Sequence, residues 1–130
     1  MAQGIFISYA TGDEKQVSEL YDSLSKIKNF EAYFAERVHD SGTNLPHEVR
    51  KRLERSKAAI ILITYNSTNT IWLNQEIGYA AAKNIPMILI VEQGIDPQGF
   101  IQGKEYIVFN RADFAQNVTQ VIARLKSIPF

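Results

Sequence analysis

The sequence contains no cysteine, and this absence excludes disulfides, thiolate nucleophiles and cysteine metal sites. Only two histidines are present, His39 and His47, and neither has a partner at metal-ligand spacing, so we expect no metal site. No apolar run is long enough to span a bilayer, and the N-terminal MAQGIFISYA lacks the basic start and cleavage site of a signal peptide. We therefore expect a cytoplasmic protein without a membrane partner.

An excess of charge of either sign is also lacking. The 14 basic residues balance the 14 acidic ones, so net charge offers no general attraction to nucleic acid or to anionic lipid. The basic cluster at residues 50–57 is interleaved with Glu48 and Glu54, a pattern typical of a solvated helix face. We expect no nucleic-acid partner.

The length and composition indicate one ordinary globular domain. A chain of 130 residues is long enough to bury a core and too short for two domains. Its hydrophobic content of 45% and charged content of 22% are typical of globular proteins. We expect a single domain over residues 1–130.

Strand and helix signals alternate along the chain. Short apolar runs predict strands at 4–9, 30–35, 58–64, 87–91 and 106–109. Helical spacing predicts helices at 14–28 and 113–127, and another that begins after residue 65 and extends to Lys83. A further helix is predicted to begin at Asn44, with Pro46 in its first turn, and a short helical turn is predicted at 98–101. Asp13 and Gln16 form a predicted capping box, while Asn29 and Asn84 are predicted helix stops.

This alternation predicts an α/β fold with a parallel sheet and helices on both faces. A three-layer, flavodoxin-like arrangement with five strands in the order 2-1-3-4-5 is the expected winding. The continuous apolar run 58–64 is expected at the centre and 106–109 at an edge. The carboxyl ends of the first three strands then lie side by side, so residues 8–12, 34–37 and 64–72 should converge on one crevice.

The stretch 65–83 holds Trp72 and Glu76, which are one helical turn apart and share a side of the helix. The expected apolar arc runs through Leu73, Ile77, Ala80 and Ala81, with Glu76 on its shoulder and no cation one turn away. Two interpretations stay open: Glu76 is a boundary residue of an amphipathic helix, or it is a functional carboxylate.

Three motifs together resemble the Toll/interleukin-1 receptor (TIR) domain family over nearly the whole chain. IFISYATGDEKQVSELYDSL is similar to the family's first box, and IWLNQEI is similar to the W-x-x-x-E segment of enzymatic members. The polar loop ERVHDSGTN stands where the family has its BB loop, and it is longer than most strand-to-helix connections. Microbial standalone members that cleave NAD+ are the most similar in organisation.

The resemblance implies that Glu76 is the catalytic carboxylate of an NAD+ nucleosidase. NAD+ would be the substrate, with no separate cofactor. Nicotinamide leaves as a neutral amine, so one carboxylate that stabilises positive charge on the ribose can suffice, unlike the pair in an ordinary glycosidase. Trp72 would form an apolar wall, or it is a helix-to-sheet packing residue.

The same resemblance implies a substrate pocket built from the ends of the first two strands. Its expected residues are Ser8, Tyr9, Ala10 and Thr11 from the first strand and loop, and Phe34, Glu36 and Arg37 from the second. Tyr9 can equally belong to the core or rim, and Glu36 and Arg37 to a solvated loop. Relatives often have a large polar residue where Ala10 stands, and an aspartate at the end of the second strand where this chain reads Ala35-Glu36.

Water attack after nicotinamide departs would give ADP-ribose, and an internal nucleophile would give a cyclic ADP-ribose isomer. The resemblance further implies a microbial antiphage signal read by a separate effector protein. It also implies head-to-tail self-assembly through the BB loop at His39, Asp40, Ser41 and Gly42.

Two other functions remain open. A non-enzymatic TIR interaction module, either a scaffold or an interfering protein, would not need Glu76. A nucleoside deoxyribosyltransferase-like enzyme shares a related fold and also uses a glutamate on a sugar. A response-regulator receiver is disfavoured, because the ends of its first and third strands carry acidic residues, whereas here they read Ser8-Tyr9 and Thr64-Tyr65.

Overall fold

The computed structural model describes residues 3–37, 47–67, 70–96 and 105–128. The strands are β1 (Gln3–Ala10), β2 (Phe30–Arg37), β3 (Ala58–Ile63), β4 (Met87–Glu92) and β5 (Ile107–Phe109). The helices are α1 (Glu14–Leu24), α2 (His47–Glu54), α3 (Thr70–Ala82) and α4 (Phe114–Lys126), and a 3₁₀ turn, η2 (Arg111–Asp113), precedes α4.

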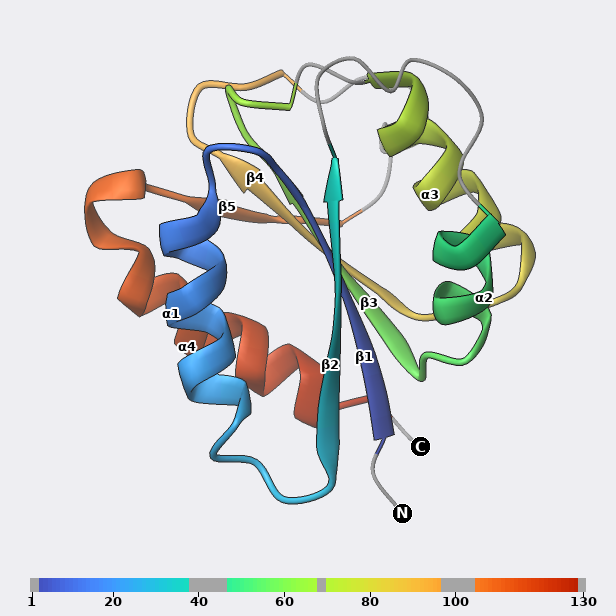
Figure 1. Ribbon diagram of the computed structural model, residues 1–130. Coiled ribbons are helices and arrows are strands. Elements are labelled where there is room, and N and C mark those ends of the chain that lie inside the picture. Colours follow the sequence, from blue (N-terminus) through green and yellow to red (C-terminus); the bar gives the residue numbers. More distant parts are fainter. Residues whose placement is uncertain (1–2, 38–46, 68–69, 97–104, 129–130) are drawn as a thin grey trace.

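All strand pairs are parallel, and their order is β2-β1-β3-β4-β5. Helices α1 and α4 cover one face of the sheet, and α2 and α3 cover the other (Figure 1). The predicted flavodoxin-like α/β fold is therefore confirmed, with β3 fully buried at the centre and β5 at an edge.

Two apolar cores lie on the two faces of the sheet. On the α1 and α4 face, Ile5 and Ile7 of β1 pack with the apolar stripe of α4. On the α2 and α3 face, Phe6 of β1 packs with Leu73 and Ile77. Successive side chains of β1 thus point into different cores, as strand geometry requires.

Several predicted boundaries need correction. Helix α1 ends at Leu24, four residues before the predicted end, and the Ser25 hydroxyl donates to the Asp22 carbonyl at 2.9 Å, a local bond that competes with helix continuation. Strand β2 runs two residues beyond its apolar part because its backbone pairs with β1 as far as Arg37. Asn29 and Asn84 both have positive φ angles, 73° and 58°. Asn84 lies just beyond the end of α3, as predicted, whereas Asn29 lies beyond the end of α1 and directly precedes β2, so it does not end the helix.

The predicted capping box is wrong. Asp13 precedes α1, but its side chain makes no capping hydrogen bond. Its carboxylate is buried and accepts hydrogen bonds from residues distant in the sequence, while Gln16 accepts from Arg111. The Asp13 side chain therefore connects α1 to segments distant in the sequence and does not cap the helix.

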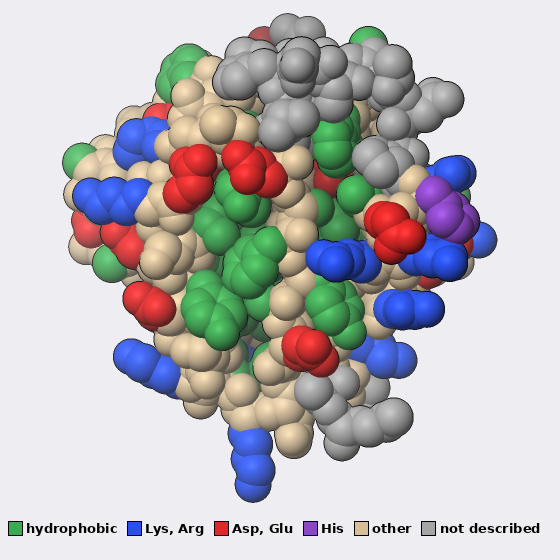
Figure 2. Space-filling view, viewed as in Figure 1, with side chains coloured by type: hydrophobic (Ala, Val, Ile, Leu, Met, Phe, Trp, Pro, Cys, Tyr) green, Lys and Arg blue, Asp and Glu red, His purple; other side chains and the backbone are tan. Residues whose placement is uncertain are grey.

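The charged face of α2 is exposed as predicted. Arg50, Lys51 and Arg52 are solvent-exposed, and Figure 2 shows basic side chains gathered on this side of the molecule. None of the helices in the described ranges combines the length and apolarity needed to cross a membrane. The Asn44 and Pro46 helix start and the turn predicted at 98–101 lie outside the described residues.

Candidate active site

Glu76 is buried in α3 and has no exposed surface. The buried side of this helix comprises Trp72, Leu73, Glu76, Ile77 and Ala80, whereas Ala81 is exposed. The buried side of α3 is therefore rotated from the predicted apolar arc toward Trp72 and Glu76, and the interpretation of Glu76 as a boundary residue is wrong. The helix turns its Trp72–Glu76 side toward the sheet.

Ser8 is the partner of Glu76 on β1. Its hydroxyl donates a short hydrogen bond to Glu76 Oε1, and Ser8 is itself fully buried. Ser8 points to the α2 and α3 face because it alternates with Ile7 and lies two residues after Phe6. The structure thus joins two predicted site residues that are 68 positions apart in the sequence.

Other predicted site residues share this region. Trp72 is 7% exposed and lies one helical turn before Glu76. Ala10 is buried at the end of β1, in register with Arg37 at the end of β2. The ends of β1 and β2 therefore lie side by side, as predicted. The BB-loop residues His39, Asp40, Ser41 and Gly42 lie outside the described residues.

Three predicted substrate contacts stand on the opposite face of the sheet from Glu76. Tyr9 packs against the core under α1 and α4, and the Phe34 ring lies 5.5 Å from that of Tyr21 on α1. Glu36 is in register with Tyr9 and accepts a hydrogen bond from the Thr11 hydroxyl at 2.7 Å. The expectation that the Phe34 ring and Glu76 face one crevice is corrected: alternation along β2, in register with β1, directs this ring to α1.

The Tyr9 phenol on this face of the sheet lies close to two acidic side chains. Burial, reinforced by the negative charges of Glu36 and Glu14, raises the pKa of the Tyr9 phenol. Tyr9 is therefore neutral at physiological pH and acts as a hydrogen-bond donor, which does not resemble an acid or base poised for catalysis.

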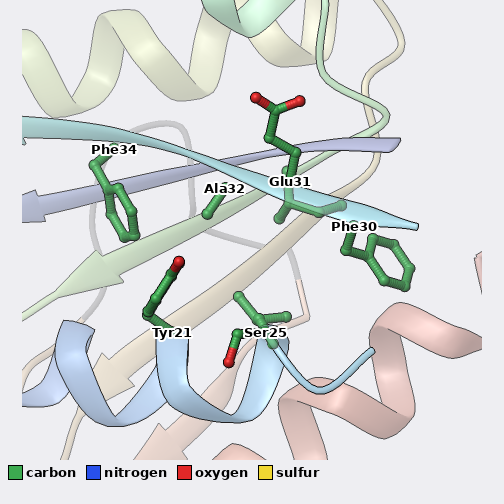
Figure 3. Close-up of a pocket in the computed structure, with 8 residues that line it drawn as sticks. Tyr21, Ser25, Phe30, Glu31, Ala32 and Phe34 are labelled. Atoms are coloured by element: carbon green, nitrogen blue, oxygen red, sulfur yellow. The ribbon is translucent and has the colours of Figure 1, made fainter. Parts of the chain in front are cut away.

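A pocket of about 460 Å³ lies between α1 and β2. In Figure 3, Tyr21 and Phe34 point into the space between helix and strand, while the Glu31 carboxylate points away from α1. Tyr21 is 45% and Phe34 37% exposed, and Figure 2 shows apolar side chains gathered here. Because Ser8 and Glu76 face the other side of the sheet, this pocket is separate from the predicted catalytic site.

A cluster that we did not predict from the sequence occupies the carboxyl ends of β1, β3 and β4. Arg111 in η2 forms ion pairs with Asp13 at 3.0 Å and with Glu92 at 2.9 Å. The hydrogen bond from Arg111 lowers the pKa of the Glu92 carboxyl, although desolvation opposes the shift. Both carboxylates raise the pKa of Arg111, so the guanidinium stays charged. No sequence signal pointed to Arg111, because its partners come from separate elements.

Comparison with known proteins agrees with the fold and the motifs. A search of curated proteins found no match to this chain. The family model described as the TIR domain matches residues 5–122, which run from within β1 to within α4 and include both Ser8 and Glu76. Together with the parallel five-stranded sheet, this match shows that the chain belongs to the TIR domain family.

Proposed function

We propose that this TIR domain cleaves NAD+ at the bond between nicotinamide and ribose, with Glu76 as the catalytic carboxylate. The observation that carries the proposal is the buried Glu76 carboxyl, hydrogen-bonded to Ser8 near the carboxyl end of β1 and one turn from Trp72. In parallel α/β sheets ligands bind outside the carboxyl ends of the strands, beside the point where strand order reverses. Here that point lies between β1 and β3.

The chemistry suits a single carboxylate. When the C–N bond breaks, the bonding pair leaves with nicotinamide, which becomes neutral, and positive charge develops on the ribose. A carboxylate in a site with little water stabilises that charge strongly. Ser8 would hold Glu76 in one orientation through its hydrogen bond, and Trp72 would supply an apolar wall. Water would then yield ADP-ribose and a proton, whereas an internal nucleophile would yield a cyclic isomer.

By analogy with microbial standalone TIR proteins, we propose that the product is a signal in antiphage defence, read by a separate effector protein. This part of the proposal rests on the resemblance alone.

The test is incubation of the folded protein with NAD+, followed by separation of the products by chromatography and mass spectrometry. Glu76→Gln keeps the size of the side chain and an acceptor for Ser8, and it should lower the cleavage rate by about 100-fold or more. Glu48→Gln on the exposed face of α2 is the matched control and should retain the wild-type rate. Equal rates in wild type and folded Glu76→Gln would refute the role of Glu76.

The second candidate function is that of a non-enzymatic TIR interaction module, with which the Ser8–Glu76 hydrogen bond is also compatible. A fully buried Ser–Glu pair can simply stabilise the packing of α3 on β1. Absence of nicotinamide release by folded wild-type protein, at all protein concentrations, would support this second function.

A further inference from the structure

Arg111 holds two carboxylates at the carboxyl ends of the sheet. Its Nε donates to Glu92 Oε2 and its Nη2 to Glu92 Oε1, both at 2.9 Å. Nη2 also donates to Asp13 Oδ1 at 3.0 Å, and Nη1 donates to Gln16 Oε1 at 3.0 Å. Asp13 is fully buried and Glu92 is 9% exposed. Such forked, charge-assisted hydrogen bonds define geometry as well as contributing energy.

The same two carboxylates hold three consecutive residues that follow β3. The Thr64 hydroxyl donates to Asp13 Oδ2 at 2.6 Å, and the Asn66 side-chain amide donates to Asp13 Oδ1 at 2.8 Å. Between them, the Tyr65 backbone N–H donates to Glu92 Oε1 at 3.0 Å. Each residue of this segment, 64–66, is therefore tied to a carboxylate that Arg111 orients.

We propose that Arg111 is a positioning residue for Glu76. Through Asp13 and Glu92 it fixes segment 64–66, which leads into α3, and thereby sets where α3 places Glu76 against Ser8. The effect on catalysis rests on the proposed function, whereas the effect on segment 64–66 does not. Arg111 makes no direct contribution to chemistry in this proposal, because its donors are directed at Glu92, Asp13 and Gln16.

An ion-pair network can also be a merely structural feature, since buried ion pairs often contribute little net stability. Two measurements separate a positioning role from that alternative. The first is amide hydrogen exchange at Tyr65, whose N–H donates to Glu92. The second is the separate measurement of kcat and KM for NAD+ cleavage, because a misplaced catalytic group lowers kcat.

The experiment compares wild type with Arg111→Lys, which keeps the positive charge and loses the planar guanidinium that donates two hydrogen bonds to Glu92. The matched control is Arg124→Lys, in a surface ion pair with Glu105 at 3.8 Å. In Arg111→Lys we expect Tyr65 exchange to quicken roughly tenfold and kcat to fall roughly tenfold or more, with KM changed by less than about threefold. Arg124→Lys should match wild type in both.

Unchanged Tyr65 exchange in folded Arg111→Lys would overturn the inference. Faster exchange with an unchanged kcat in an active enzyme would overturn the link to Glu76. If wild type does not cleave NAD+, the proposed function fails, and exchange still decides whether Arg111 holds segment 64–66. Should Arg111→Lys not fold, the triple variant Asp13→Asn, Glu92→Gln, Arg111→Met removes the fork without leaving a buried charge, and the same exchange result is expected.

Discussion

Glu76 shows how one residue can serve both packing and the proposed chemistry. Because it is fully buried and accepts a hydrogen bond from Ser8, Glu76→Ala should leave a cavity and an unsatisfied hydroxyl. We expect a loss of about 2–4 kcal/mol in the free energy of unfolding. Glu76→Gln keeps volume and acceptor and should cost about 1 kcal/mol or less. Urea denaturation of both variants measures the difference, and equal stability of wild type and Glu76→Ala would contradict this packing role.

At the scale of elements, Leu53 and the half-buried Val49 pack α2 against the core on the α3 side of the sheet. Leu53 is its single fully buried residue, while the basic residues around it are exposed. Leu53→Ala should therefore destabilise the protein by about 3 kcal/mol and increase proteolysis within α2 at a constant protease concentration. Arg52→Ala, on the exposed side of the same helix, serves as the control and should stay within about 0.5 kcal/mol of wild type. A stable, protected Leu53→Ala variant would show that α2 is held by other contacts.

The ion pair between Glu92 at the end of β4 and Arg111 in η2 should make the free energy of unfolding depend on pH. Arg111 lowers the pKa of Glu92, so this carboxylate contributes stability above its unfolded-state pKa of about 4.3. The contribution is lost as the pH falls through the lower pKa of the folded state. Between about pH 6 and pH 3, Glu92→Gln should therefore lose less unfolding free energy than wild type, as measured by urea denaturation. Glu105→Gln is the control and should follow wild type, because the Glu105 side chain is 91% exposed.

At the scale of the whole molecule, the burial of Glu76 sets a condition on activity. Under the proposed function, NAD+ would reach this carboxylate only when the atoms that cover it move, and the proposed association with a second copy would favour such an open form. We expect the rate per molecule to rise at least about fivefold between roughly 0.5 and 50 µM protein, as association with a second copy populates that form. Cleavage assays combined with light scattering test this, and a constant rate per molecule would contradict it.

Much of the fold was predictable because it depends on local patterns. The fully apolar segment Ala58–Ile63 is typical of a strand buried on both sides, and Asn84 follows the end of α3 with a backbone angle that asparagine tolerates. The alternation of strands and helices then allows only a few strand orders in a parallel sheet. The W-x-x-x-E spacing likewise placed Trp72 and Glu76 on one side of a helix, as observed.

By itself, then, the sequence determined the parallel α/β sheet and a helix that carries Glu76 beside Trp72, because both follow from periodicities within short segments. Only the tertiary structure decided that Glu76 meets Ser8 while Phe34 faces α1, because this depends on helix rotation and on the register between β1 and β2. The same holds for Arg111, which meets Asp13 and Glu92 from another part of the chain. Such contacts form between segments far apart in sequence, so no local pattern encodes them.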